Sequence, residues 1–267
     1  MPKKVRLDLH LLTQGLVSSR QQAQNLIRAG KVRTQNGLLL DKPGQEVLDT
    51  LEVCIKNPPR FVSRGGEKLI AALNTFPINV KGRICIDCGI STGGFTDCLL
   101  KKGASRVYGI DVGYGQVDWG LRNDPRVLLK ERTNLRTLTH ENLYEKKDPW
   151  PNFAVADLSF ISLTLVLPSI TALLKKEHSE SILLIKPQFE VGRGKVGKGG
   201  VVRDADSHLY ALNKVISKST YLGWETKGVI PSPITGPAGN HEYLLWLAMG
   251  GESNSLDLNK LVSNTLN

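Results

Sequence analysis

One glycine-rich segment, residues 87–97, restricts the possible folds of this chain more than any other part of it. The segment reads Asp-Cys-Gly-Ile-Ser-Thr-Gly-Gly-Phe-Thr-Asp and directly follows the apolar run Ile84-Cys85-Ile86. This order predicts a buried strand that enters a tight turn, followed by a helix over residues 95–102 whose first turn can meet a ligand. A second strand-like run, residues 106–110, ends at Asp111, where βαβ nucleotide sites place an acid that binds ribose hydroxyls. The segment therefore predicts a cofactor loop.

The spacing of the glycines argues against a dinucleotide cofactor. Gly89, Gly93 and Gly94 do not form the pattern G-x-G-x-x-G, and Asp87 stands just before the first of them. A carboxylate at this place would repel a pyrophosphate but could attract the ammonium of a methionine moiety. The loop therefore favours S-adenosylmethionine over NAD, and an ordinary strand-to-helix turn without a ligand is the alternative for this loop taken alone.

The charge of the chain indicates a polyanionic partner. The formal net charge is +10, and residues 1–60 hold ten Lys or Arg against five Asp or Glu, so half of the excess lies in less than a quarter of the chain. Such a surplus is typical of proteins that bind nucleic acid, although it also aids solubility. No run approaches the roughly 20 apolar residues that a membrane-spanning helix needs, and Met1-Pro2-Lys3-Lys4 leads into a charged segment rather than a signal peptide. We therefore expect a cytoplasmic protein with no membrane partner.

The cysteines do not predict a metal site. Cys85 and Cys88 have C-x-x-C spacing, but the sequence has no second such pair and no cluster of His to complete the four ligands of zinc. Cys85 also lies within a strand pattern, where a buried thiol packs as a small apolar side chain. We expect no metal.

Residues 1–58 predict a small α+β domain. Two helices, over about residues 7–15 and 19–30, precede a hairpin around Asn36-Gly37 and a strand over residues 51–55. This order resembles the αL RNA-binding module of a small-subunit ribosomal protein, pseudouridylate synthases and tyrosyl-tRNA synthetases. The residues that carry the resemblance are Arg6-Leu7-Asp8, Gly15-Leu16, Ser18-Ser19-Arg20, Ala23, Leu26-Ile27, Gly30, Val32, Asn36-Gly37, Lys42-Pro43 and Val47.

The resemblance to the αL module implies that basic side chains meet the backbone of folded RNA. We expect these contacts from one group of basic residues, the last of them outside the domain: Arg6, Arg20, Arg28, Lys31, Arg33 and Arg64. The alternative is a small basic domain that only packs against the rest of the chain.

Residues 59–250 form a second predicted domain, which follows a proline-stiffened joint at residues 56–60. Helical and strand-like runs alternate along it, which predicts a doubly wound α/β sheet with ligands outside the carboxyl ends of the strands. The basic glycine-rich segment 192–200 is expected to be a lid or a solvated connection, and residues 251–267 are a C-terminal tail of open role. The expected strands are residues 83–87, 106–111, 127–130, 153–157, 181–186, 226–230 and 242–248, and the expected helices are residues 67–75, 95–102, 117–122, 163–175 and 204–222.

Four ionisable residues are candidates for catalysis. Asp157 and Lys186 close predicted strands, and Glu242 begins the last strand, which would bring it to the same edge if that strand is antiparallel. Lys68 stands at the start of the first helix of the domain. Each residue alone is more often a surface charge or half of an ion pair. Four such charges at one edge beside a cofactor loop indicate a reaction centre.

Several blocks of sequence in the same order make the chain similar to the TlyA family, also called haemolysin A, of ribosomal-RNA 2′-O-methyltransferases with an FtsJ-like catalytic domain. The resemblance implies a Rossmann-like class I fold that uses S-adenosylmethionine, with seven strands, the last of them antiparallel. It also implies a cytidine in ribosomal RNA near the subunit interface as the target, so ribosomal RNA or ribosomal subunits are the expected partners. It covers residues 5–248 and rests on Val62-Ser63-Arg64-Gly65-Gly66-Glu67-Lys68-Leu69, the glycine-rich segment 87–97, Gly109-Ile110-Asp111-Val112-Gly113, Glu131-Arg132-Thr133-Asn134, Ala156-Asp157-Leu158-Ser159-Phe160-Ile161-Ser162, Lys186-Pro187-Gln188-Phe189-Glu190 and Glu242-Tyr243-Leu244.

The family's functional residues carry over to this chain position by position. The resemblance implies that the catalytic Lys-Asp-Lys-Glu tetrad of the family corresponds to Lys68, Asp157, Lys186 and Glu242. It implies that the S-adenosylmethionine site comprises Asp87, Gly89, Ser91, Thr92, Gly93, Asp111, Asn134 and Asp157.

The residue types of the tetrad suit methyl transfer to a ribose 2′-hydroxyl, which is a poor nucleophile until it loses its proton. A lysine beside a second cation can act as the base, and we assign this role to Lys186, oriented by Asp157 and Glu242. Lys68 is expected to stabilise the developing alkoxide or to hold phosphate. Two alternatives from other classes are a noncatalytic RNA-binding or ribosome-assembly factor and a membrane-active haemolysin, although no amphipathic or spanning segment of adequate length supports the second. The sequence does not predict the oligomeric state.

Overall fold

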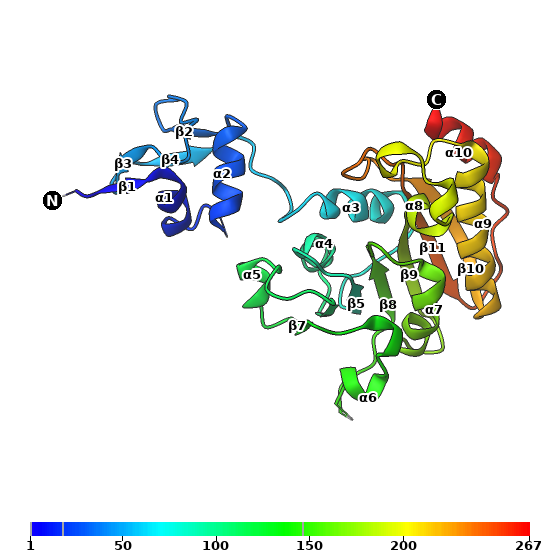
Figure 1. Cartoon of the computed structure of the whole chain (residues 1–267). Helices are drawn as coiled ribbons and strands as arrows, with labels where there is room; N and C mark the ends of the chain where they lie inside the picture. The colour runs from blue at the N-terminus through cyan, green and yellow to red at the C-terminus, as the bar shows by residue number, and fades with distance from the viewer. Residues whose placement is uncertain (1, 18, 146) are drawn as a thin grey trace. The chain divides into compact units, whose positions relative to one another are not determined.

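The structure is a computed structural model that describes residues 2–17, 19–145 and 147–267. Its contacts divide the chain into two compact units, residues 1–60 with 118–123 and residues 61–117 with 124–267, and each is described by itself (Figure 1). Ser18, which belongs to the blocks that resemble the αL module, and Met1 of the predicted N-terminal domain lie outside the described residues.

The first unit is built from two short helices and two small antiparallel ladders. Side chains of both helices and of strands β2, β3 and β4 contribute to its apolar core, which includes Leu7, Leu11, Ala23 and Ile27. The Ser19 hydroxyl accepts the backbone N–H of Gln22, as a capping residue does. The elements are β1 (Lys4–Arg6), α1 (Leu7–Thr13), α2 (Arg20–Arg28), β2 (Val32–Thr34), β3 (Glu46–Leu48) and β4 (Val53–Ile55), with β1 paired to β3 and β2 paired to β4, and the short helix α5 (Trp119–Arg122) belongs to residues 118–123.

The expected hairpin is only partly formed. The chain does turn at Gly37, and the Thr34 and Leu40 N–H groups bond the carbonyls of Leu38 and Val32. Beyond this turn, however, residues 38–40 add a single bridge, between Arg33 and Leu39. Leu38 is 67% exposed and gains little from the sheet. Val53 is buried there instead, so β4 becomes the ladder partner of β2.

The second unit is a seven-stranded sheet in the order β10-β11-β9-β8-β5-β6-β7. Strand β11 is antiparallel to both of its neighbours, and the pairs among β5 to β9 are all parallel, which confirms the α/β class and the antiparallel last strand. The strands are β5 (Ile84–Cys88), β6 (Arg106–Ile110), β7 (Val127–Lys130), β8 (Phe153–Ala156), β9 (Glu180–Ile185), β10 (Trp224–Pro231) and β11 (Tyr243–Met249), and the helices are α3 (Gly65–Thr75), α4 (Gly94–Lys101), α6 (His140–Leu143), α7 (Leu163–Ala172), α8 (Pro187–Glu190), α9 (Ala205–Tyr221) and α10 (Leu258–Leu266), with 3-10 turns at Leu135–Thr137, Arg193–Lys195 and Lys198–Gly200.

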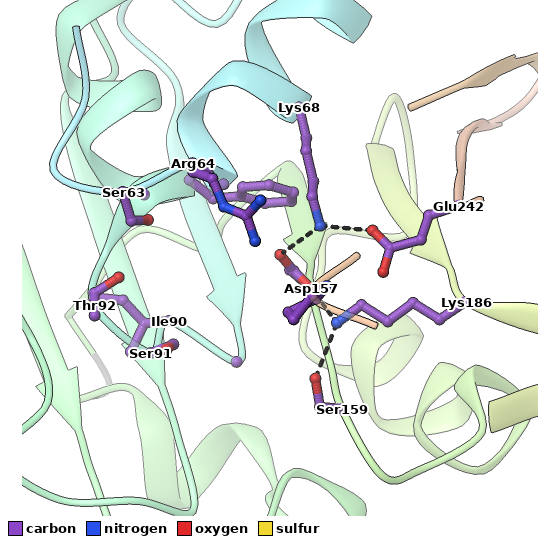
Figure 2. Close-up of a pocket in the computed structure, with 15 residues that line it drawn as sticks. Ser63, Arg64, Lys68, Ile90, Ser91, Thr92, Asp157, Ser159, Lys186 and Glu242 are labelled. Atoms are coloured by element: carbon purple, nitrogen blue, oxygen red, sulfur yellow. Dashed lines mark hydrogen bonds and ion pairs between the residues drawn. The ribbon is translucent and has the colours of Figure 1, made fainter. Parts of the chain in front are cut away.

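The order of the strands brings distant parts of the chain to one edge of the sheet. Parallel strands β5, β8 and β9 end at this edge, and antiparallel β11 begins there, because Tyr243 pairs with Ile185. Side chains from these strand ends and from α3 surround a cavity (Figure 2).

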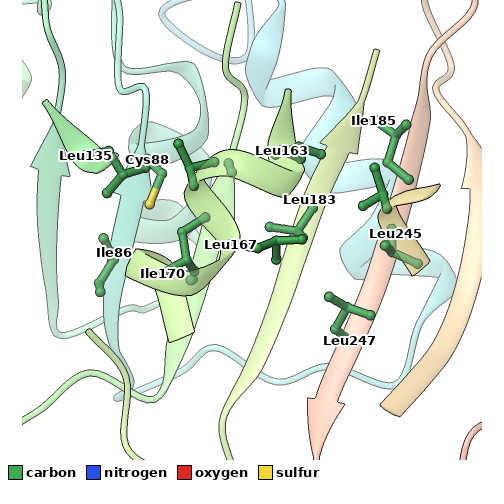
Figure 3. Packing of buried hydrophobic residues seen from close by; sticks show 14 of the residues in the cluster. Ile86, Cys88, Leu135, Leu163, Leu167, Ile170, Leu183, Ile185, Leu245 and Leu247 are labelled. Atoms are coloured by element: carbon green, nitrogen blue, oxygen red, sulfur yellow. The ribbon is translucent and has the colours of Figure 1, made fainter. Parts of the chain in front are cut away.

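The two faces of the sheet carry different helices. Ile86 and Cys88 share one face with Leu245 and Leu247, and this face packs against α7 (Figure 3). Helices α9 and α10 add buried side chains to the same core. Side chains alternate along a strand, so Trp246 points to the opposite face. There its ring lies 5.2 Å from the ring of Phe76, the residue that follows α3.

The tail contains a helix that is not among the elements expected from the sequence. Helix α10 has Asp257 as its N-cap, and its Val262 is 1% exposed in the core beside α9. Leu258, Leu261 and Leu266 pack against the same core, so they and Val262 follow the helical spacing of an apolar face.

Candidate active site

A cavity of about 310 Å³ lies at the edge where β5, β8 and β9 end. Its walls come from the start of α3, the glycine-rich loop before α4, and the segments that follow β8 and β9 or precede β11. The lining residues are Ser63, Arg64, Gly65, Lys68, Gly89, Ile90, Ser91, Thr92, Gly94, Phe95, Asp157, Ser159, Lys186, Pro237 and Glu242.

The four candidate catalytic residues form a continuous row of alternating charges in this cavity (Figure 2). Lys68 Nζ donates to Glu242 Oε2 at 2.6 Å and lies 3.9 Å from Asp157 Oδ2. The other oxygen of Asp157, Oδ1, is 2.6 Å from Lys186 Nζ. Asp157 therefore stands between two ammonium groups that come from distant parts of the chain.

One detail of the expected arrangement is wrong. Among the described residues Glu242 forms no hydrogen bond or ion pair with Lys186, since its buried carboxylate bonds Lys68 of α3 instead. The second partner of Lys186 is Ser159, whose Oγ accepts from Nζ at 2.9 Å. Ser159 is absent from the site residues expected from the sequence, although it stands two residues after Asp157 in the block 156–162, which carries part of the family resemblance.

Burial makes the charges of this row interdependent. Lys68 is 7% exposed and Lys186 is 8% exposed. A buried charge without a partner costs several kcal/mol, so each ammonium needs the carboxylate beside it.

The turn before β11 is held by the side chain of Asn240. Its Oδ1 accepts the backbone N–H of Val202, and its Nδ2 donates to the carbonyl of Gly200. The row is therefore held in place from several elements.

The glycine-rich loop comes close to the carboxylate of the β8 segment. Gly89 has φ +85°, and a Cβ there would lie 2.9 Å from the carbonyl oxygen of Asp157, so only glycine fits. Gly93 has φ +97° at the N-cap of α4. Glycine at position 89 thus lets the loop pack directly against the backbone that carries Asp157, which brings the loop and this carboxylate to one wall of the cavity.

Asp111 is tied to this loop. Its Oδ2 accepts the backbone N–H of Ser91 at 2.8 Å, and its Oδ1 accepts the N–H of Gly113 at 2.7 Å. Asp111 does not line the cavity, and neither do Gly93 and Asn134. The side chain of Asn134 accepts the N–H of Arg136 at the start of the turn Leu135–Thr137. Of the expected cofactor residues, the cavity is lined by Gly89, Ser91, Thr92 and Asp157.

Asp87 lies deeper than expected for a residue that meets a ligand. It is fully buried, and its Oδ2 accepts the hydroxyl of Thr96 at 2.7 Å. Its Oδ1 has no hydrogen-bond partner among the described residues. Burial raises the pKa of Asp87 to about 7. The orphaned oxygen beneath the loop fits a cationic group such as an ammonium better than it fits a phosphate.

The pKa of Asp87 predicts a dependence of stability on pH. The folded-state pKa of about 7 lies above the ordinary value of 3.8, so the unfolded chain releases a proton that the folded chain retains between these values. The free energy of unfolding should therefore fall by about 1.4 kcal/mol per pH unit from about pH 4 to pH 7, relative to an Asp87→Asn variant. Urea unfolding of both proteins across this range measures the difference. Asp206→Asn, which changes an exposed acid of α9, should run parallel to the wild type, and parallel curves for Asp87→Asn would contradict the prediction.

The expected RNA-binding residues fall into two places. In the first unit, Arg6 and Arg20 each lie 3.0 Å from the buried carboxylate of Asp8, while their side chains remain 45% and 48% exposed. Arg6 holds the pKa of Asp8 well below its usual range. Arg28 is exposed, and Lys31 and Arg33 are partly exposed. Arg64 lies in the second unit, where it lines the cavity.

Phe160 is a further residue that is absent from the expected site. Its side chain is 91% exposed, although its backbone has φ +65°, an uncommon conformation for a residue other than glycine. Its ring lies 5.3 Å from that of Phe189, and both residues belong to segments that carry the charged row. An apolar ring is thus presented to solvent three residues after Asp157.

Two kinds of feature do not occur within the described ranges. The His, Cys, Asp and Glu side chains there form no group of three that could hold a metal ion. None of the helices described is both long and apolar enough to cross a membrane.

Both parts of the chain match known protein families. Residues 61–249 match the FtsJ-like methyltransferase family, and residues 5–52 match the S4 domain. The 16S/23S rRNA (cytidine-2′-O)-methyltransferase TlyA of Mycobacterium tuberculosis (strain H37Rv) is 49% identical over 249 residues, which cover 92% of this chain and 91% of that protein. Hemolysin A of Brachyspira hyodysenteriae is 42% identical over 240 residues, 90% of this chain and 98% of that protein. A solved structure from Streptococcus thermophilus has a TM-score of 0.75 at 39% identity and covers 99% of this chain and 96% of that one.

Proposed function

The chain belongs to the TlyA family of FtsJ-like ribosomal-RNA methyltransferases, and from this premise we propose that it transfers a methyl group from S-adenosylmethionine to the 2′-hydroxyl of a cytidine in ribosomal RNA. The observation that carries the proposal is the charged row of Lys68, Asp157, Lys186 and Glu242 beside the glycine-rich loop. A noncatalytic RNA-binding protein has no need for two lysines and two acids in one cavity, because their burial costs free energy.

The residues of the loop fit the cofactor. Gly89 lines the cavity and has φ +85°, and the buried carboxylate of Asp87 beneath the loop has an unpaired oxygen, which suits a cationic group better than a phosphate. Ser91 and Thr92 bring a hydroxyl group each to the cavity wall. When bound, S-adenosylmethionine supplies an electrophilic methyl group. Asp111 directly follows β6, and its carboxylate accepts the backbone N–H groups of Ser91 and Gly113. A ribose hydroxyl of the cofactor could replace one of these two donors.

The row of charges then acts on the ribose oxygen. We assign the acceptance of the 2′-hydroxyl proton to Lys186 Nζ, and Asp157 and Ser159 hold this group in place. Lys68, which is paired with Glu242, stabilises the negative charge that develops on the oxygen. Arg64 lines the same cavity and is free of the row, so it suits a phosphate next to the target ribose.

The first unit supports RNA as the substrate. An S4 domain spans residues 5–52, and the half-exposed guanidinium groups of Arg6 and Arg20 are oriented by Asp8. Basic groups fixed in this way match phosphates along a folded backbone and read shape rather than base edges. Ribosomal RNA or a ribosomal subunit is therefore the proposed partner.

The direct test is a methyl-transfer assay. The protein is incubated with S-adenosylmethionine labelled in the methyl group and with naked ribosomal RNA or assembled subunits, and modified riboses are mapped by their resistance to alkaline cleavage. The proposal expects label at a cytidine 2′-oxygen. Binding of RNA without transfer would instead support the assembly-factor alternative, and label on a base would exclude the ribose as the target.

The exposed ring of Phe160 should contribute to the binding of the target nucleotide. Stacking of a base on an aromatic side chain is worth about 1–3 kcal/mol, so Phe160→Ala should lower kcat/KM for RNA by about 10-fold or more. Its ring is 91% exposed, so the thermal midpoint should change little. Tyr221→Ala removes another exposed ring, from the end of α9, and should leave kcat/KM unchanged. Equal values for both variants would exclude a stacking role.

A further inference from the structure

Glu190, the last residue of α8, is a buried carboxylate in direct contact with two other elements. The residue is 2% exposed. Oε1 accepts the backbone N–H of Leu163, the first residue of α7, at 2.7 Å. Oε2 accepts the hydroxyl of Ser162, the residue before that helix. Lys214 of α9 lies 3.5 Å from Oε2, and its Nζ also donates to the backbone carbonyl of Glu190 at 2.7 Å. The charge of Glu190 is thus fully compensated.

These contacts join the two segments that carry the reaction centre. One segment starts at Asp157 after β8 and ends at Ser162, and the other starts at Lys186 after β9 and ends at Glu190. At their near ends they are joined by the contacts of Lys186 with Asp157 and Ser159, at 2.6 and 2.9 Å. At their far ends they are joined by Glu190. The two segments therefore form a closed frame rather than two separate loops.

A requirement for stability alone explains this arrangement poorly. The removal of a carboxylate from water is costly, and an apolar side chain of similar volume often stabilises a protein as well as a buried ion pair does. Ser162 can also cap α7 without Glu190, since its hydroxyl accepts the N–H of Thr164. What an apolar residue could not supply is a directional link between the two segments.

We propose that Glu190 is a positioning residue for methyl transfer, which fixes the Lys186 amine relative to Asp157 and Ser159 through Ser162 and Leu163. The inference rests on the proposed function for its consequence in catalysis. It goes beyond the tetrad, because Glu190 does not line the cavity and touches none of its four charges. A misplacement of about 1 Å at a reacting group can cost about 100-fold in rate, so the frame should act on kcat.

The test uses Glu190→Gln, which keeps the size of the side chain and exchanges one acceptor oxygen for a donor. We expect kcat to fall by about 10- to 100-fold, while the Kd for S-adenosylmethionine and the KM for RNA stay within about twofold of the wild type. Ser162→Ala, which removes only one hydroxyl, should also lower kcat without a change in Kd or KM, but to a smaller extent. This variant replaces Glu190→Gln in the test if Glu190→Gln folds poorly.

Glu180→Gln is the matched control. Glu180 begins β9, so it lies at the other end of the strand that leads to Lys186, and it pairs with Arg83 and accepts from Trp246 Nε1 at 2.9 Å. This variant should lose stability without loss of kcat. A kcat within twofold of the wild type for Glu190→Gln, or an equal fall of kcat in both variants, would overturn the inference.

A second measurement does not depend on methyl transfer. Limited labelling with an amine-reactive reagent, followed by mass spectrometry, reports how accessible Lys186 is, and this side chain is 9% exposed in the intact frame. Labelling of Lys186 should rise severalfold in Glu190→Gln and stay at the wild-type level in Glu180→Gln. If the wild type transfers no methyl group, the proposed function fails, while the labelling still decides whether Glu190 positions Lys186. Unchanged labelling of Lys186 would overturn the inference.

Discussion

Replacement of Lys186 by alanine is expected to lower the rate of methyl transfer by about 100-fold or more while the affinity for S-adenosylmethionine stays nearly intact. Lys186 Nζ contacts Asp157 of the row, Ser159 Oγ and the ring of Phe189, and it lies across the cavity from Ile90, Ser91 and Thr92 of the glycine-rich loop (Figure 2). Its loss thus removes the acceptor of the hydroxyl proton without a change in the loop. Single-turnover rates with saturating RNA and a titration of the cofactor give the two quantities.

A second lysine variant serves as the control for both quantities. Lys176→Ala, which removes an exposed lysine before β9, should behave as the wild type does. A loss of cofactor affinity as large as the loss of rate would refute the role of Lys186 as the base.

The second large effect concerns stability. Lys68→Met should reduce the free energy of unfolding by about 3 kcal/mol, because Glu242 is 1% exposed and would lose the ammonium group 2.6 Å away. The same variant should lose most of its methyl transfer, since the positive charge beside the reacting oxygen is gone. Urea unfolding and the transfer assay measure the two changes.

The double variant Lys68→Met/Glu242→Leu separates the two effects. It replaces the whole pair by apolar side chains of similar size, so most of the lost stability should return. Methyl transfer should stay low, because the charges themselves are required. Recovery of activity along with stability would show that Lys68 and Glu242 serve only the fold.

Much of the fold could be predicted because its core elements are regular. The strands of the large sheet are apolar runs such as Ile182-Leu183-Leu184-Ile185, buried on both faces, and the helices between them have apolar faces of the correct period. Strands β1 and β3 could not be predicted in the same way. Each has three residues, and β1 places a single apolar residue, Val5, between Lys4 and Arg6. Their pairing depends on contacts far apart in sequence.

The residues of the site could be predicted better than their partners. The positions of Asp157 and Lys186 follow from the ends of their strands, since parallel strands end at a common edge. Whether Glu242 bonds Lys68 or Lys186 depends instead on how α3 packs beside β11, which no local pattern encodes. The complete burial of Asp87 could not be predicted from the sequence either, because it results from Thr96 and from the loop that covers the carboxylate.

Strand β11 is the last strand of the sheet in chain order, yet it lies between β9 and β10 rather than at an edge. A polypeptide interrupted before residue 243 therefore has a gap in the middle of its sheet, with the unpaired backbone groups of β9 and β10 facing each other across it. All residues of the first unit, 1–60 and 118–123, have been synthesised by that point. During synthesis, affinity for RNA should thus arise before the ability to modify it, and unfinished chains that bind ribosomal RNA would leave it unmethylated.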